Sequence, residues 1–169
     1  MKFRKPNLQD IKEIESYKKE FIDSKSSMDG TGILVKASAE EWLKYNQEME
    51  TIEAPTLSKA LQYGLFDEND RLLGLLQIRL ELKGYLIDFG GHIGYCVRPT
   101  ERRKGYAKTM LQEALCICKD KGLKKVLITC LETNIASSKT IEACGGIFEK
   151  IIFDHINYKE NLKRYWIEV

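Results

Sequence analysis

The sequence predicts an α/β fold of the α+β kind, with a mixed but mostly antiparallel sheet of about six or seven strands and about four helices. Two observations predict it. Apolar runs separated by short polar turns fill residues 57–97, which is typical of consecutive antiparallel strands. Residues 91–131 read as strand, helix and strand, which is typical of a parallel crossover. The two kinds of connection together make the sheet mixed.

The first third of the chain reads as a short strand followed by two helices. Residues 2–5 form the strand, Pro6 closes it, and Asn7 caps the first helix. A capping box of Ser38 and Glu41 opens the second helix. We interpret Trp42 and Tyr45 as anchors of this helix on the core rather than as substrate contacts. Apolar residues of the first helix recur at helical spacing, at Leu8, Ile11, Ile14, Tyr17, Phe21 and Ile22.

The rest of the chain alternates apolar runs with turns and two further helices. The polar stretch 67–70 joins two of these runs as a hairpin, and Lys83-Gly84 makes the next turn. The near-continuous apolar run 126–131 predicts a strand that is buried on both faces, as in parallel sheets. The predicted strands are residues 57–66, 71–80, 91–97, 126–131, 147–153 and 162–169, and the predicted helices start near Ala107 and Asn134.

Composition limits the function classes. A chain of 169 residues with 43% hydrophobic and 31% charged residues is expected to form one domain, residues 1–169. Its net charge of +2 gives no global attraction to nucleic acid. No apolar run reaches the ~20 residues that span a bilayer, and the first residues lack the apolar core of a secretory signal. We therefore expect a cytoplasmic protein with no membrane partner.

The five cysteines are interpreted as buried free thiols. Each falls among apolar neighbours on a predicted strand or helix, and their odd number does not suggest a disulfide framework. Cys116 and Cys118 point to different sides of a helix and make a poor metal pair, so we predict no metal site. The cysteines are Cys96, Cys116, Cys118, Cys130 and Cys144.

A basic glycine loop lies at the centre of the crossover. Between Arg98 and Lys108 there are five basic residues and one acidic residue. The first amides of a helix have no intrahelical partner and lie at the positive end of its dipole, so an anion can bind there. Gly105 lets a ligand approach the backbone, and the small Ala107 keeps the first turn open. The loop therefore predicts a phosphate ligand.

The spacing of this loop separates it from two common phosphate loops. It has neither the paired glycines and Lys-Ser/Thr of a Walker loop nor the three glycines of a Rossmann turn. Arg102-x-x-Gly105-x-Ala107 resembles instead the pyrophosphate loop of the GNAT superfamily of acyl-CoA-dependent N-acetyltransferases. Val97-x-Pro99 precedes it at the usual distance, and Asn134 follows the next strand, as in that family. The resemblance extends from about Gly91 to Phe148.

The resemblance implies an acetyl-CoA site between two central parallel strands that splay apart. The pantetheine arm would fill that gap and bond to the main chain of the first strand, while the pyrophosphate would bind the amides that open the helix. Asn134-x-x-Ser137 matches the segment whose Asn bonds the pantetheine and whose small residue leaves it room. The implied cofactor-binding residues are Tyr95, Cys96, Val97, Arg102, Arg103, Lys104, Gly105, Tyr106, Ala107, Lys108, Thr109, Asn134 and Ser137.

The catalytic groups are less clear from the resemblance. Many relatives place a tyrosine proton donor seven residues after the Asn, and this chain has Ile141 there. The remaining candidates near the gap are Tyr95, His92 and Tyr158. The side chains of His92 and Tyr95 are expected to point to opposite faces of the strand, because the two residues are an odd number of positions apart, unless a bulge near Gly90-Gly91 reverses this order. Structural roles for these side chains, and a base that acts through water, remain open alternatives.

The leading hypothesis is an N-acetyltransferase that moves an acetyl group from acetyl-CoA to a primary amine of a small molecule or a protein, by direct attack. One alternative is a catalytically silent acyl-CoA-binding or regulatory module, because of Ile141 and the unassigned base. A nucleic-acid-binding domain is less favoured, because the basic patch is small and has no interleaved aromatic platform. The acceptor cannot be identified from the sequence, and a homodimer is one option for the assembly.

Overall fold

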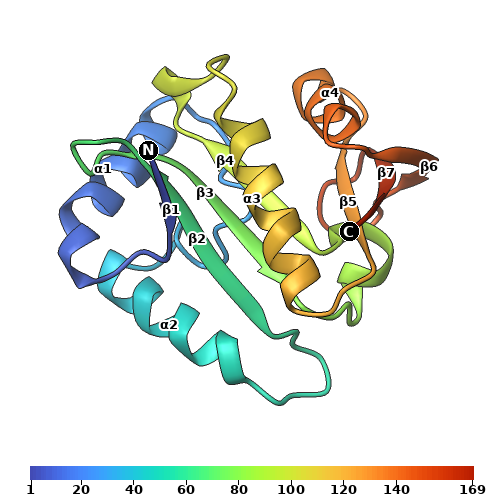
Figure 1. The fold of residues 1–169 in the computed structure, drawn as a ribbon, viewed down its shortest axis with the longest axis horizontal. Helices are drawn as coiled ribbons and strands as arrows, with labels where there is room; N and C mark the ends of the chain where they lie inside the picture. The colour runs from blue at the N-terminus through green and yellow to red at the C-terminus, as the bar shows by residue number, and fades with distance from the viewer.

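The computed structural model describes all residues, 1–169, as two antiparallel sheets with helices around them (Figure 1). The first sheet has the order β1-β2-β3-β4, and the second has the order β5-β7-β6. The strands are β1 (Lys2–Arg4), β2 (Ala60–Phe66), β3 (Leu72–Arg79), β4 (Ile93–Val97), β5 (Lys125–Leu131), β6 (Ile147–Phe153) and β7 (Asn161–Glu168). The mostly antiparallel pairing predicted from the sequence is confirmed.

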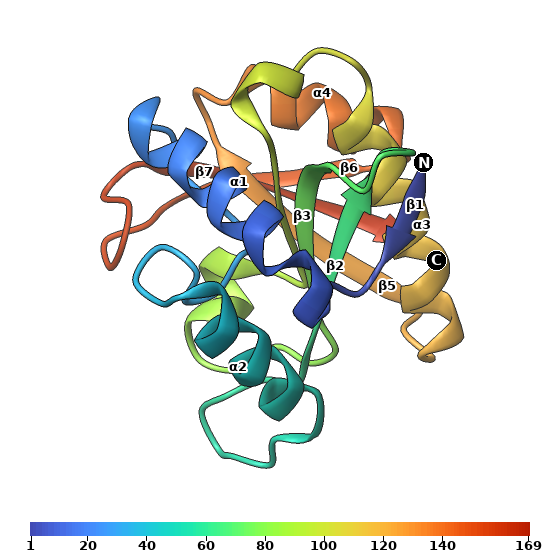
Figure 2. The ribbon, with the colours of Figure 1, turned by 90° about the vertical axis from the view of Figure 1, so that its left-hand side faces the viewer.

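Four α-helices pack on these sheets, and none of them is long and apolar enough to cross a membrane. In Figure 2, α1 and α2 lie on one side of β2 and β3, and α3 lies on the other. The helices are α1 (Ile11–Asp23), α2 (Ala39–Thr51), α3 (Tyr106–Asp120) and α4 (Ile135–Ala143). Short 3₁₀ turns occupy Leu8–Asp10 (η1) and Pro99–Glu101 (η3).

The hydrophobic core has two parts, one on each face of the first sheet. Fully buried Tyr17, Phe21 and Trp42 pack from α1 and α2 onto one face. On the other face, Met110 and Leu111 of α3 join residues of β3, β4, β5 and β7. Side chains alternate along a strand, so the two faces of β4 contact different parts of the core. Residues 94 and 96 face α1, and residues 93, 95 and 97 face α3.

The predicted helix caps form as expected. Ser38 Oγ accepts from Glu41 N–H, and Glu41 returns a bond to the Ser38 amide, which completes the capping box of α2. Asn7 caps η1, and α1 continues from it. The apolar stripe is shorter than predicted, because Leu8 and Ile22 are exposed.

Two further details differ from the sequence-based expectations. Cys116 is exposed because it lies on the outer side of α3, and Cys144, the C-cap of α4, is only half-buried; the other three cysteines are buried thiols. A π-turn, η2 (Leu86–Gly90), precedes β4 where an extended entry was expected. Arg79 stabilises it by donating to the carbonyls of Gly90 and Gly91, a contact across strands that sequence periodicity does not reveal.

Candidate active site

The loop before α3 has the backbone expected of an anion site. Gly105 adopts a left-handed conformation (φ 84°) and occupies the N-cap position of α3. No side chain caps this end, and the first helical bond runs from Thr109 N–H to Gly105 O. The amides of Tyr106, Ala107 and Lys108 are therefore left for a ligand. A Cβ placed on Gly105 would point into open space, so the approach to these amides is unobstructed.

Arg98 does not belong to the phosphate-binding surface, which corrects the charge count made from the sequence. Its side chain is 3% exposed and forms ion pairs with Glu13 (2.7 Å) and Glu20 (3.1 Å) of α1. Its Nη2 also donates to Ser16 Oγ. Arg98 therefore joins β4 to α1, with its charge balanced inside the fold.

The other basic side chains of the loop divide into two groups. Arg102 donates from Nε to Val97 O (3.3 Å) and from Nη2 to Ser26 Oγ (2.6 Å), and Lys104 pairs with Glu101 at 2.7 Å. Arg103 and Lys108 are exposed and form no ion pair within the chain. Arg103 is also held at φ 65°, which turns the chain into α3. Arg102, Arg103 and Lys108 therefore carry positive charge that no acidic side chain balances, and the side chains of Arg103 and Lys108 form no hydrogen bond within the chain.

Strands β4 and β5 separate as expected for the central pair. Figure 1 shows them diverging from a common point. They meet where His92 N–H donates to Leu127 O at 2.7 Å, and Leu127 N–H donates back to His92 Nδ1 at 2.8 Å. Beyond this point the strands belong to different sheets. The splayed pair implied by the family resemblance is confirmed.

The backbone register shows which groups of β4 face the gap. Arg79 N–H bonds His92 O and Arg98 N–H bonds Leu73 O, so alternate residues of β4 are tied to β3. In an antiparallel pair the residues between point their N–H and C=O groups the other way, toward β5. These residues are Ile93, Tyr95 and Val97, and Val97 O is already bonded to Arg102. Tyr95 therefore offers a free amide and a free carbonyl.

Cys96 differs from the expectation that it contacts the cofactor. Its register places its backbone groups against β3, and its carbonyl also accepts from Tyr17 Oη at 3.0 Å. The thiol is buried beside the same phenol, and burial raises its pKa to about 12. Cys96 is thus part of the packing between β4 and α1.

His92 is held by the contact that joins the two sheets. Its side chain is buried, and burial together with the nearby charge of Arg79 lowers its pKa to about 4. The lone pair of Nδ1 accepts the Leu127 amide, so the other ring nitrogen carries the proton of the neutral ring. The bond occupies the atom that would act as a base, which gives His92 a positioning role.

Tyr95 spans the gap toward α4. Its Oη lies 2.8 Å from Ser137 Oγ, and burial raises the pKa of the phenol. Asn134 caps α4 by accepting the Ser137 amide with Oδ1 at 3.1 Å, which leaves its side-chain NH₂ group exposed. The structure thus brings together Tyr95, Asn134 and Ser137, three of the residues selected from the sequence. Ile141 is fully buried in the core.

Tyr158 lies on the opposite side of β4, with a partner that the sequence did not suggest. Its Oη donates to Asp29 Oδ1 at 2.8 Å, which ties the β6–β7 loop to the α1–α2 loop. Gly30 packs directly on Gly94 of β4, where a Cβ would lie 2.0 Å from Gly94 O. The Asp29 carboxylate is therefore fixed next to the middle of β4, on the face away from α3.

The β6–β7 loop is held in place by a buried carboxylate. Asp154 accepts from Tyr85 Oη at 2.5 Å and from the amides of Ile156, Asn157 and Tyr158. Tyr85 belongs to the turn before β4, so this cluster fixes Tyr158 relative to that strand. Sequence reasoning missed Asp29, Arg79 and Asp154 because they come from separate turns, and no local motif marks them.

Comparison with known proteins supports the geometry. The model of the acetyltransferase (GNAT) domain matches residues 1–147. A search of curated protein sequences gave no significant match.

Several solved structures are similar over the whole fold. A point mutant of spermidine N-acetyltransferase SpeG from Vibrio cholerae is 17% identical, with a TM-score of 0.70, and the match covers 99% of this chain and 95% of that one. The V. cholerae enzyme in complex with CoA and spermine is 18% identical, with a TM-score of 0.69 and coverage of 99% and 94%. RimL, a ribosomal L7/L12 α-N-protein acetyltransferase in complex with coenzyme A, is 16% identical, with a TM-score of 0.73 and coverage of 99% and 93%.

Proposed function

Since this chain belongs to the GNAT acetyltransferase family, we propose that its site lies in the gap between β4 and β5 and that it acetylates a cationic amine. The chain is an acetyl-CoA-dependent N-acetyltransferase. The observation that carries the site assignment is the uncapped start of α3, with left-handed Gly105, beside a strand whose Tyr95 backbone is unpaired. A bound acetyl-CoA would meet the start of α3 with its phosphates and the backbone of Tyr95 with its pantetheine arm, which ends in the thioester.

The cofactor-binding groups follow from that path. The amides from Tyr106 to Lys108 would hold the pyrophosphate, with Arg103 and Lys108 as the free cations. The backbone of Tyr95 and the NH₂ group of Asn134 would bond the pantetheine arm. Arg102 acts indirectly, because its bonds to Val97 and Ser26 set the shape of the loop. When bound, acetyl-CoA supplies the activated acyl carbon.

Tyr95 is the group that we propose as proton donor to the leaving thiolate. Its phenol is protonated near neutral pH, because burial raises its pKa, and Ser137 Oγ orients it. Many relatives have a tyrosine proton donor at the position of Ile141, and in this chain Tyr95 would serve as the donor instead. The amine would lose its proton to water on the other face of β4, where Asp29 and Tyr158 lie.

The acceptor would enter from this other face, between the α1–α2 and β6–β7 loops. The fixed carboxylate of Asp29 suits a positively charged amine more than a neutral one. Spermine is bound by one structural relative, and a ribosomal protein is the substrate of another, so both small amines and protein amines belong in the screen.

The experiment measures thiol release from acetyl-CoA with a panel of polyamines, amino sugars and peptide N-termini. Release that depends on one amine supports the proposal. Tight coenzyme binding with no turnover on any amine would contradict it and favour a binding module. Gly105→Trp should abolish coenzyme A binding in calorimetry. Because Gly105 has a positive φ, Gly105→Asn is the matched control, since Asn tolerates this backbone without a bulky side chain.

We further propose that two copies pair through β6. This strand is an edge strand of its sheet, on the side away from β5, and Ile147 (71% exposed), Phe148, Ile151 and Phe153 are all exposed. A long apolar edge of this kind associates in water unless it is covered. Light scattering should report a dimer that Ile147→Lys dissociates, and a wild-type monomer would contradict this.

The cytoplasmic location also remains a proposal, which cell fractionation tests.

A further inference from the structure

Arg79, the last residue of β3, carries a charge that the fold does not balance. The other arginines that are at least half-buried each form an ion pair with a carboxylate, and these are Arg4, Arg98 and Arg164. Arg79 is half-buried, and its side chain bonds only to backbone carbonyls. Burial lowers the pKa of its guanidinium, since the charged form loses solvation. An anion from outside the chain would stabilise this charge.

The free edge of the Arg79 side chain has the geometry of a carboxylate site. Its Nη1 donates to Gly90 O at 3.2 Å and to Gly91 O at 3.3 Å, which fixes the plane of the guanidinium. Its Nε and Nη2 have no hydrogen-bond partner in the chain, and neither atom is sealed from solvent. A Cβ on Gly94 would lie 3.3 Å from Nη2, so this edge is on the face of β4 away from α3. Nε and Nη2 together form a donor pair that can bind both oxygens of a carboxylate.

Arg164 shows that the turn before β4 does not require an unpaired charge. It also holds η2, by donating to the carbonyls of Ile87 and Asp88, and its charge is paired with Glu149 at 2.6 Å. Two arginines therefore stabilise the same turn, and only Arg79 does so without an acidic partner. The unbalanced charge is thus not explained by the turn.

Asp29 provides the opposite charge on the same face of β4. Its carboxylate accepts from Tyr158 Oη at 2.8 Å and from Ser27 Oγ at 3.0 Å, and it forms no ion pair. It is close enough to Arg79 to favour the charged guanidinium, but the two groups do not pair with each other. Both charges are therefore left for a ligand.

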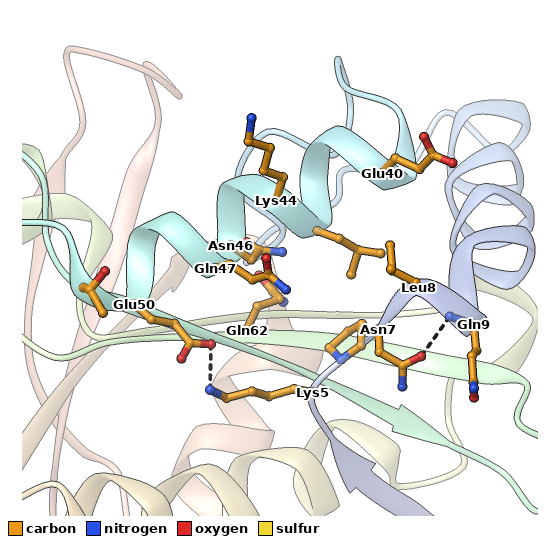
Figure 3. Close-up of a pocket in the computed structure, with 13 residues that line it drawn as sticks. Lys5, Asn7, Leu8, Gln9, Glu40, Lys44, Asn46, Gln47, Glu50 and Gln62 are labelled. Carbon is orange, nitrogen blue, oxygen red and sulfur yellow. Dashed lines mark hydrogen bonds and ion pairs between the residues drawn. The ribbon is translucent and has the colours of Figure 1, made fainter.

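The position of Asp29 is fixed through the next residue of its loop. Gln62 donates from Nε2 to Gly30 O at 3.1 Å, and Figure 3 shows the Gln62 side chain beneath α2. Gly30 in turn packs on Gly94 of β4. A cation and an anion are thus held on one face of the strand, each without an ionic partner.

The ligand that complements this arrangement has an ammonium group and a carboxylate on one small framework. An amino acid has both, so one molecule can satisfy Arg79 and Asp29 at once. A polyamine carries positive charges alone and would bring one of them toward Arg79, which disfavours it. A carboxylic acid without an amine could bind Arg79 but has no nitrogen to acetylate.

We propose that the acceptor is an amino acid, whose carboxylate binds Nε and Nη2 of Arg79 and whose ammonium group binds Asp29. This proposal rests on the proposed entry of the acceptor at this face of β4, and it narrows the acceptor to one class. In the reaction the amine loses a proton to water, and its nitrogen forms a bond with the acetyl carbon. The carbon–sulfur bond breaks and the thiolate takes up a proton, so the products are an N-acetyl amino acid and coenzyme A.

The test compares each proteinogenic amino acid with its carboxamide, which keeps the ammonium group and lacks the negative charge. The full-length chain is saturated with coenzyme A, and ligand-observed NMR titrations give the Kd of each compound. We expect at least one amino acid to bind at least about tenfold more tightly than its carboxamide, which is the effect of a bidentate, charge-assisted pair. With acetyl-CoA in place of coenzyme A, the same amino acid should have the higher kcat/KM of the two.

Two matched variants separate binding by Arg79 from its structural contacts. Arg79→Lys keeps the charge and a donor for the turn but removes the planar donor pair, so most of the preference should disappear while the Kd of the carboxamide stays the same. A merely structural role would change both compounds alike. Arg164→Lys makes the same change in the other arginine of the turn and should keep the full preference. If Arg79→Lys does not fold, the comparison in the wild-type protein still decides the proposal.

The proposal is overturned if no amino acid binds more tightly than its carboxamide, if Arg79→Lys keeps the full preference, or if Arg164→Lys removes it as well. Acetylation of an amine with no preference for a carboxylate would also overturn it, and would leave the proposed acetyl transfer intact. Carboxylate-dependent binding without turnover of any amine would have the opposite meaning, because it supports Arg79 as the carboxylate site and contradicts the proposed function.

Discussion

The contact between His92 and Leu127 predicts a pH-dependent stability that a single substitution should remove. His92 Nδ1 accepts a backbone amide at the point where β4 and β5 separate, and this requires a neutral ring. Its pKa is about 4 in the folded chain. An unfolded histidine has a pKa of about 6.5, so the unfolded state binds the proton more tightly. The stabilisation is present above pH ~6.5 and is lost as the pH falls from there toward pH ~4.

The size of the effect follows from the difference between the two pKa values. A pKa of about 4 in the folded chain against about 6.5 in the unfolded chain corresponds to about 3 kcal/mol of stability at the acid limit, and about 2 kcal/mol of this is lost between pH ~7 and pH ~5. His92→Asn is the matched variant, because Asn Oδ1 can accept the Leu127 amide from nearly the position of Nδ1 and does not titrate. His92→Leu leaves the buried amide unpaired and should cost about 1–3 kcal/mol at neutral pH.

The assay is urea unfolding of the three proteins at pH ~7 and pH ~5. The wild type should lose about 2 kcal/mol more than His92→Asn between these two pH values. Equal losses in both proteins would refute the assignment of this pH dependence to the buried His92 ring. Kinetics add a second check, because a positioning residue predicts that His92→Asn keeps most of kcat. A fall of 10²-fold or more in kcat would instead make His92 a general base, given the usual size of that effect.

Three further substitutions test individual contacts. Arg98→Met should lower the free energy of unfolding by about 2–4 kcal/mol, because it leaves Glu13 and Glu20 without their buried partner. The same variant should change the Kd for coenzyme A by less than about twofold. A large loss of coenzyme affinity would instead show that Arg98 contributes to phosphate binding. Tyr95→Phe should lower kcat by about 10²-fold with unchanged coenzyme binding, and unchanged kcat would remove Tyr95 as proton donor. Tyr158→Phe frees Asp29 and should raise the KM of the acceptor, while stability changes by less than about 0.5 kcal/mol; an unchanged KM would separate this loop from the acceptor.

Local patterns in the sequence predicted the elements well. The capping box of Ser38 and Glu41, the Asn7 cap and the hairpin around residues 67–70 all depend on neighbours in the chain. The order of strand, loop and helix around Gly105 is local too, because a glycine with positive φ followed by a helix marks a start of this kind. These features could be predicted because the residues that cause them are close together in the sequence.

Charges and thiols were harder to place, because their surroundings come from distant segments. In the sequence, Arg98 counted toward the basic charge of the loop, and Arg102 was predicted to bind the cofactor. Their actual partners, Glu13 and Ser26, lie on α1 and in the loop after it. Periodicity also made Cys116 look buried, although it is on the exposed side of α3. Composition gives the number of charges in a segment, and only packing decides which of them face the solvent.

The two faces of β4 explain why the site needs residues from so many segments. On one face, Tyr95 reaches α4, which also provides the Asn134 cap. On the other face, Gly94 allows Gly30 to pack at close range, and this brings Asp29 to the strand. The edge of β4 that faces β5 is unpaired because the two strands meet only at His92 and belong to different sheets beyond it. A thioester laid along β4 would therefore have Tyr95, the proposed proton donor, on one face and the Asp29 carboxylate, proposed to bind the cationic acceptor, on the other.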